Sequence, residues 1–196
     1  MNLILASNSP RRKEILSKAG YDFKIVASNY DEKICGLKYS DELVENCAYN
    51  KALEVSKRLS GDFIVVGADT VVVSDDIILG KPKDYDEAHN MLLALSDKKH
   101  FVATAVCLIS SNGKALKDID VTTVTFRKLS DDEIDSYILY NNPLDKAGSY
   151  GIQDKNFNFA ILVEGELDNV IGFPLKLFKK MYDLILEWLQ KIKMGI

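Results

Sequence analysis

FIVVGADTVVV, residues 63–73, is an apolar run interrupted only by Gly67, Asp69 and Thr70. Continuous apolar runs of this length are typical of a β-strand that is covered on both faces. The run therefore predicts a central strand. A carboxylate, Asp69, stands inside it, where burial would separate an ionised group from water.

Shorter strands and amphipathic helices are expected on both sides of this run. The hydrophobic pattern predicts strands at residues 3–6, 23–27, 77–79, 101–109, 121–126 and 159–163, with the strands at 101–109 and 121–126 as antiparallel neighbours. It predicts helices at residues 10–20, 40–59, 86–95, 130–140 and 175–192. The fourth of these helices opens with the capping box Ser130–Glu133.

The composition is typical of a globular protein with one core. The 196 residues are 47% hydrophobic and 28% charged, which favours one domain, residues 1–196, or one core split by a cleft. A net charge of −4 argues against broad nucleic-acid or membrane binding, since both need a basic face. A polyanionic ligand would therefore have to meet a local basic cluster.

The cysteines and the apolar segments indicate a cytoplasmic protein. Cys35, Cys47 and Cys107 are odd in number and lack paired metal-ligand spacing, so reduced thiols are expected and structural zinc is not. Met1 leads directly into strand residues, and no apolar run reaches about 18 residues. Neither a signal peptide nor a membrane span is expected.

The segment Leu3–Leu16, LILASNSPRRKEIL, starts a helix with positive charge. Ser9 is a good N-cap and Pro10 suits the first helical position. Arg11 and Arg12 then oppose the positive end of the helix dipole by roughly 0.3–1 kcal/mol each. A bound anion would reverse that sign, and free N–H groups beside two guanidiniums suit a phosphate. The alternative is that both arginines extend into water.

Two further charges fall where burial is expected. Lys51 lies within the apolar stripe of the second helix, and Asp69 lies in the central strand. An unpaired charge in a core costs several kcal/mol, so each needs a partner. Either the two pair with each other and are structural, or Asp69 holds a divalent cation and Lys51 a phosphate. Lys81, in the short arm Gly80–Pro82, favours a cleft, and Glu32 could be a second carboxylate for magnesium.

Signatures of several other enzyme classes are absent. The sequence contains neither G-x-x-x-x-G-K-[ST] nor G-x-G-x-x-G, which argues against a P-loop kinase and a Rossmann dehydrogenase. The two histidines, His89 and His100, give little support to a serine or cysteine triad. His89 is expected to be solvated, and His100 to make a structural hydrogen bond.

An ordered set of motifs covers nearly the whole chain. It comprises L-A-S-x-S-P-R-R at 5–12, Asp31-Glu32, A-x-x-K-A at 48–52, G-A-D-T-V-V at 67–72, G-K-P at 80–82, P-L-D-K-A-G-S-Y-G-I-Q at 143–153 and N-V-I-G-F-P-L at 169–175. Together these motifs resemble the Maf proteins, nucleoside triphosphate pyrophosphatases related in fold to the inosine triphosphate pyrophosphatases. This sequence departs from the family pattern at Ser96-Asp97, at Asp154 after Gln153 and in residues 164–168. These departures are small, and they affect loop shape and hence base preference.

The resemblance implies a mixed α/β fold with a twisted sheet, flanking helices and two lobes around a central cleft. It implies a cytoplasmic enzyme that hydrolyses a nucleoside triphosphate to the monophosphate and pyrophosphate with Mg²⁺ or Mn²⁺. Such an enzyme could be a homodimer. Asp69 would accept the proton of the attacking water, and Glu32 and Asp69 would hold the metal. The triphosphate would be bound by Ser7, Ser9, Arg12, Lys51 and Lys81.

Base choice is linked in the family to the positions that match Arg11, Thr70 and Gln153. The segment G-S-Y-G-I-Q at 148–153 is similar to the branch that cleaves dTTP and UTP rather than to the branch that acts on 7-methyl-GTP. A glutamine amide offers a donor and an acceptor, and so can pair with the uracil or thymine edge. The hypothesis is a dTTP/UTP pyrophosphatase that removes non-canonical or excess pyrimidine nucleotides.

The alternative is a nucleotide-binding regulator of cell division, because the family name also carries an association with septum inhibition. A pure sensor would not require a carboxylate that activates water. The presence of Asp69, Lys51 and Lys81 therefore favours the enzyme.

Overall fold

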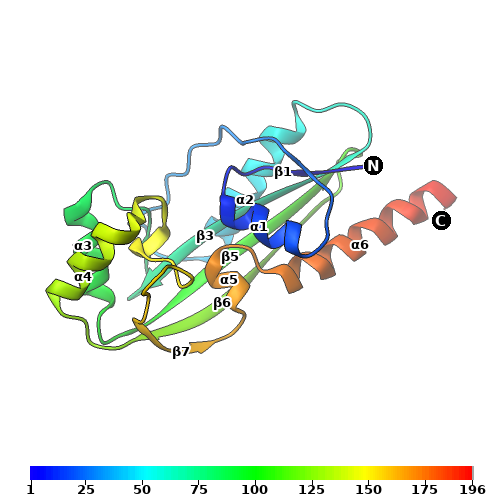
Figure 1. Ribbon diagram of the computed structural model, residues 1–196. Coiled ribbons are helices and arrows are strands. Elements are labelled where there is room, and N and C mark those ends of the chain that lie inside the picture. Colours follow the sequence, from blue (N-terminus) through cyan, green and yellow to red (C-terminus); the bar gives the residue numbers. More distant parts are fainter. Residues whose placement is uncertain (196) are drawn as a thin grey trace.

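The computed structural model describes residues 1–195 and contains a seven-stranded mixed sheet with helices on both faces (Figure 1). The strand order is β2-β1-β3-β5-β6-β7, with β4 paired to β3. The strands are β1 (Asn2–Leu5), β2 (Lys24–Ile25), β3 (Phe63–Ser74), β4 (Ile77–Leu79), β5 (Lys99–Ser110), β6 (Ala115–Phe126) and β7 (Ala160–Glu164). The helices are α1 (Pro10–Lys18), α2 (Asp41–Ser56), α3 (Tyr85–Leu95), α4 (Asp131–Asn141), α5 (Leu167–Ile171) and α6 (Leu175–Met194). The mixed α/β fold is confirmed.

Strand β3 lies in the middle of the sheet and has different neighbours along its two edges. On one edge it pairs antiparallel with β5 from Ile64 to Val73. On the other edge β1 runs parallel to it only as far as Val66, and β4 pairs with it from Val72 onward. Within the described chain, the residues between them, Gly67–Val71, have no strand partner on that edge. A gap therefore opens in the sheet beside the middle of β3.

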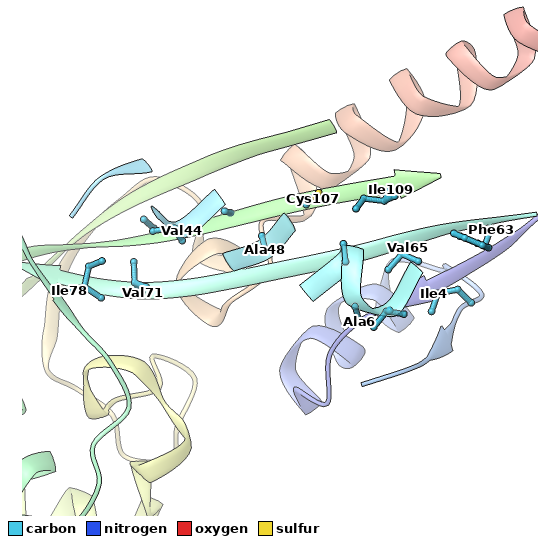
Figure 2. Packing of buried hydrophobic residues seen from close by; sticks show 14 of the residues in the cluster. Ile4, Ala6, Val44, Ala48, Phe63, Val65, Val71, Ile78, Cys107 and Ile109 are labelled. Atoms are coloured by element: carbon cyan, nitrogen blue, oxygen red, sulfur yellow. The ribbon is translucent and has the colours of Figure 1, made fainter. Parts of the chain in front are cut away.

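Helix α2 covers one face of the sheet and packs against alternate residues of β3, among them Val65 and Val71 (Figure 2). This spacing of two is what the pleat of a strand requires. The closest approach is at Gly67, where a Cβ atom would lie 2.2 Å from the carbonyl oxygen of Ala48. The absence of a side chain at Gly67 thus lets α2 touch β3 one turn before Lys51.

The opposite face carries two separate groups of helices. Helices α1 and α6 pack over β1, β3 and β5 around Leu16, Phe173 and Phe178. Helices α3 and α4 pack over β5 and β6 around Leu92 and Phe126, and Figure 1 shows them together at the end of the sheet farthest from the end of α6. Among the described helices, none combines the length and the apolar composition needed to cross a bilayer.

Several local predictions are confirmed. Lys51 is buried within the apolar stripe of α2, although it is charged. The capping box forms at the start of α4, where Ser130 accepts from the N–H of Glu133 and the Glu133 carboxylate accepts from the N–H of Ser130. His100 makes the expected structural hydrogen bond, with Nε2 lying 2.9 Å from Tyr150 Oη.

Other expectations are wrong, each where long-range contacts decide the outcome. The second strand is confined to Lys24–Ile25, because it pairs only with the last two residues of β1. Helix α2 ends before Leu59, and β6 begins at Ala115 because it pairs with β5 over nearly its full length. Helix α5 was not expected from the pattern. His89 is only partly exposed, at 22% of its side chain: its Nδ1 lies 2.7 Å from the Asp135 carboxylate and links α3 to α4.

Candidate active site

A cavity of about 360 Å³ lies at the gap beside β3. The chain passes from the end of the parallel strand β1 into the start of α1 at this point, a position where open α/β sheets commonly bind ligands. The segment that follows α4 closes the other side. The cavity is lined by every residue selected from the sequence: Ser7, Ser9, Arg11, Arg12, Glu32, Lys51, Asp69, Thr70, Lys81 and Gln153.

The cavity wall is basic, although the chain as a whole is acidic. Five cationic side chains contribute to it, against three acidic ones, whereas the whole chain has a net charge of −4. The cationic residues are Arg11, Arg12, Lys51, Lys81 and Lys146. The acidic residues are Glu32, Asp69 and Asp145. The local basic cluster that a polyanionic ligand would need is therefore present.

The start of α1 presents polar groups to this cavity. Ser9 occupies the N-cap position as expected, but its side chain makes no capping hydrogen bond. Its backbone N–H instead donates to Ser7 Oγ at 3.2 Å. Within the described part of the chain, the first turn therefore has no side-chain cap, which leaves its start open to an anion.

Arg12 is fixed in the cavity wall by three hydrogen bonds. Its Nε donates to the carbonyl oxygen of Gly172 at 2.9 Å, Nη1 to Ser7 Oγ at 3.2 Å and Nη2 to Thr70 Oγ1 at 3.1 Å. Burial lowers the pKa of Arg12, while the charges of Asp69 and Glu32 oppose that shift. Arg12 thus does not extend into water, and its orientation is set before any ligand arrives.

Arg11 and Thr70, the expected specificity residues next to Arg12, are also held in place. Arg11 Nη1 donates to Asp145 Oδ2 at 2.9 Å, which joins the start of α1 to the segment after α4. Thr70 Oγ1 accepts from Thr104 Oγ1 at 3.0 Å and donates to the carbonyl oxygen of Gly172 at 3.3 Å. Lys81 is exposed at the cavity wall.

Lys51, Asp69 and Glu32 form a cluster at the gap in the sheet. Lys51 Nζ lies 2.5 Å from Asp69 Oδ1 and 2.5 Å from Glu32 Oε1, and it donates to the carbonyl oxygen of Ala68 at 3.3 Å. Lys51 and Asp69 are only 7% and 2% exposed. The ion pair between Lys51 and Asp69 that a structural role requires is therefore present. Both residues also line the cavity, as binding of a cation and a phosphate would require.

The two carboxylates of this cluster have opposite pKa shifts. Burial raises the pKa of Asp69 to about 6, against the attraction of Lys51 and with a contribution from the negative charge of Glu32. Burial acts in the same direction on Glu32, but the charge and hydrogen bond of Lys51 outweigh it and lower the pKa of Glu32. At pH 7 Asp69 is therefore mostly ionised, yet it is a stronger base than an ordinary aspartate. A group that takes a proton from water needs both properties.

One oxygen of Asp69 has no partner. Oδ2 is buried and makes no hydrogen bond within residues 1–195, while Oδ1 is occupied by Lys51. A buried carboxylate oxygen without a donor costs roughly 1–3 kcal/mol or more, so its presence calls for an explanation. A water molecule or a cation would satisfy it.

The Maf-like protein family model matches residues 2–184 of this sequence. The chain belongs to the Maf family. Three relatives are named dTTP/UTP pyrophosphatase. The protein of Alkaliphilus oremlandii is 47% identical over 88% of this chain and 90% of its own length. That of Clostridium perfringens is 43% identical over 94% and 98%, and that of Thermococcus gammatolerans is 44% identical over 96% and 100%.

A solved structure, the nucleoside-triphosphatase (dITP/XTP pyrophosphatase) of Mycobacterium abscessus, overlaps this Maf family chain in part. The TM-score is 0.45 at 17% identity, covering 66% of this chain and 76% of that one.

The structure adds cavity residues of this Maf family chain that were not singled out from the sequence. Lys146 lines the cavity and is 9% exposed, held between the carboxylates of Asp145 and Asp154. Tyr150 also lines the cavity and stacks on Phe157 with ring centroids 5.6 Å apart. Periodicity could not reveal them, because they lie in an irregular segment with no helical or strand pattern. Their only signal was a place in the motif at 143–153.

Proposed function

We propose that this protein hydrolyses dTTP and UTP to the nucleoside monophosphate and pyrophosphate. The observation that carries the proposal is the buried Asp69 carboxylate, with one oxygen unpartnered, in the wall of a cavity that is otherwise basic. The names of relatives at 40–47% identity support the same activity. A regulator of cell division is not favoured, because these relatives carry the name of an enzyme.

The triphosphate would bind along the basic part of the wall. Arg12 presents a guanidinium that is already oriented, and guanidinium groups bind phosphate oxygens in a bidentate way. Ser7 and Ser9 lie beside it at the uncapped start of α1. Lys51 and Lys81 would neutralise further phosphate charge, and charge stabilisation of this kind is the main task in phosphoryl transfer.

Asp69 would accept a proton from the attacking water through Oδ2. The water oxygen forms a bond to the phosphorus of the base-proximal phosphate, and the bond from that phosphorus to the bridging oxygen of the leaving pyrophosphate breaks. The proton passes to Asp69, whose other oxygen is already fixed by Lys51 at 2.5 Å. Because that contact immobilises the carboxylate, Oδ2 needs little reorganisation to receive the proton.

A divalent cation fits the donor set of this cluster. Within residues 1–195 no group of three or more His, Cys, Asp or Glu side chains is arranged to hold a metal. Mg²⁺, however, needs only one or two carboxylates when waters and substrate phosphates complete its shell. The carboxylates of Asp69 and Glu32 would supply them. When bound, Mg²⁺ or Mn²⁺ would neutralise phosphate charge and lower the pKa of water.

The base would lie against the segment after α4. Gln153 is exposed there and lines the cavity, and its amide can pair with the uracil or thymine edge. Arg11 and Thr70, which also line the cavity, would contribute to base choice. A cellular role in removing non-canonical or excess pyrimidine nucleotides would follow from this selectivity.

Product analysis tests the proposed reaction. UTP incubated with the protein and Mg²⁺ or Mn²⁺ should yield UMP and pyrophosphate in equal amounts, separated by anion-exchange chromatography. A variant with Asp69→Asn, purified in the same way, controls for contaminating phosphatases. The appearance of UDP and orthophosphate as first products would overturn the proposal.

A further inference from the structure

A hydrogen-bonded network lies behind the cavity wall that residues 146–153 form. Asp154 is at its centre: Oδ2 accepts from Tyr137 Oη at 2.6 Å and lies 3.3 Å from Lys146 Nζ. Tyr137 Oη in turn accepts from the backbone N–H of Gly151 at 2.9 Å. Lys146 and Gly151 line the cavity, whereas Asp154 and Tyr137 do not. The network therefore stabilises this wall from the side that faces away from the cavity.

The members of this network are shielded from water. The Lys146 and Asp154 side chains are 11% and 13% exposed, and Tyr137 is 5% exposed. Burial, together with the hydrogen bond to Asp154, raises the pKa of Tyr137, so its hydroxyl remains a donor at neutral pH. Buried polar groups of this kind are costly to leave unpaired. Each member thus restrains the others.

At Gly151 the network forms hydrogen bonds with the backbone. Its N–H donates to Tyr137, its carbonyl oxygen accepts from the N–H of Asp154 at 2.9 Å, and a Cβ atom at Gly151 would lie 2.7 Å from Asp154 Oδ1. Gln153 stands between Gly151 and Asp154 in the chain, so both flanks of Gln153 are anchored. No hydrogen bond of the Gln153 side chain to residues 1–195 is present, and its position therefore depends on this backbone.

We propose that Asp154 and Tyr137 are positioning residues for nucleobase selection. They set the place of the backbone that carries Gln153, and so act on the base of the ligand without touching it. This inference rests on the proposed function, in which Gln153 pairs with the pyrimidine edge. A side chain that must meet two polar atoms of a base gains from having its backbone fixed beforehand, because less conformational entropy is lost on binding.

Binding measurements that need no turnover test the inference. Calorimetry would compare UMP with inorganic tripolyphosphate, which lacks a base, on the wild type and on the variants Asp154→Ala, Asp154→Asn and Tyr137→Phe. We expect UMP binding to weaken about tenfold in Asp154→Ala and Tyr137→Phe, and tripolyphosphate binding to stay within about twofold. Asp154→Asn keeps an acceptor for Tyr137 and should lie between. Tyr140→Phe, on the same helix at an 80% exposed position, is the matched control and should change neither.

Kinetics give a second readout that a merely structural role would not produce. In the variants KM for UTP should rise about tenfold while kcat changes less than about threefold, and the ratio of kcat/KM for UTP over CTP should fall. Equal weakening of UMP and tripolyphosphate, or unchanged UMP binding, would overturn the inference. If Asp154→Ala fails to fold, Asp154→Asn and Tyr137→Phe carry the comparison.

The two proposals can fail independently. A wild type that binds UMP but releases no UMP from UTP would refute the proposed function, while the binding comparison would still decide the role of Asp154. A wild type that hydrolyses UTP, with Asp154 variants of unchanged KM and selectivity, would refute only the positioning role.

Discussion

Replacement of Lys51 by methionine separates the structural from the ligand-binding part of its role. Lys51→Met keeps the length and apolar character of the side chain but removes the charge that lies 2.5 Å from both Asp69 Oδ1 and Glu32 Oε1. Asp69 is 2% exposed, so its charge would be left in the core without compensation. Breaking a buried pair in this way typically destabilises a protein by about 3–5 kcal/mol.

The size of the loss should depend on pH, with a sign that follows from the pKa of Asp69. In the wild type that pKa is about 6, so from about pH 7 upward Asp69 is mostly ionised in both the folded and the unfolded chain and adds little slope. Without Lys51 the pKa rises further, and the folded chain retains a proton that the unfolded chain, with a pKa of about 3.9, has lost. Stability of the variant should therefore fall as pH rises, by up to about 1.4 kcal/mol per pH unit, or about 3 kcal/mol from pH 6 to 8.

Urea unfolding at pH 6, 7 and 8 measures this difference directly. Lys18→Met is the matched control: Lys18 also pairs with a carboxylate, Glu14 at 2.6 Å, but its side chain is 75% exposed, so little loss and no comparable slope are expected. Addition of Mn²⁺ to Lys51→Met should restore part of the stability, because a cation can replace the missing charge. A variant as stable as the wild type at pH 8, or one whose loss does not change with pH, would refute the reasoning.

Three further outcomes are expected. Asp69→Asn should lower kcat by about 10²–10⁴-fold while the protein stays folded and still binds nucleotide in calorimetry, and substantial turnover would reject Asp69 as the base. Burial lowers the pKa of His100 to about 4. Between about pH 6.5 and 4, His100 therefore stays neutral in the folded chain but is protonated in the unfolded chain. His100 should therefore contribute a loss of stability of up to about 3 kcal/mol from pH 6.5 to 4, and denaturant titrations of His100→Phe should lack this contribution. Gly67→Ala should destabilise by at least about 1–3 kcal/mol, because its Cβ would lie 2.2 Å from the backbone oxygen of Ala48; a melting temperature equal to the wild type would contradict this.

Local order was largely predictable from the sequence, because its causes are local. The apolar run at 63–73 is the central strand β3, and Ser130 with Glu133 forms the expected capping box at the start of α4. The spacing of apolar residues on α2 was enough to place Lys51 inward. Failures occurred where pairing between distant segments sets the length of an element: β2 is cut short by its single partner β1, and β6 is extended by β5.

By itself the sequence determined which residue types are available for chemistry and in which element each lies. It identified Arg12, Lys51 and Asp69 because charge at a helix start, in an apolar stripe or in a buried strand is a local anomaly. Only the tertiary structure decided that these groups share one cavity. The register of β1 and β4 on β3 leaves Gly67–Val71 unpaired on one edge, and the resulting gap lets Asp69 meet Lys51. The contact of Asp154 with Tyr137 has the same origin. Tyr137 lies on the buried stripe of α4, but Asp154 follows no periodic pattern, and only packing of the segment after α4 against that helix brings them to 2.6 Å.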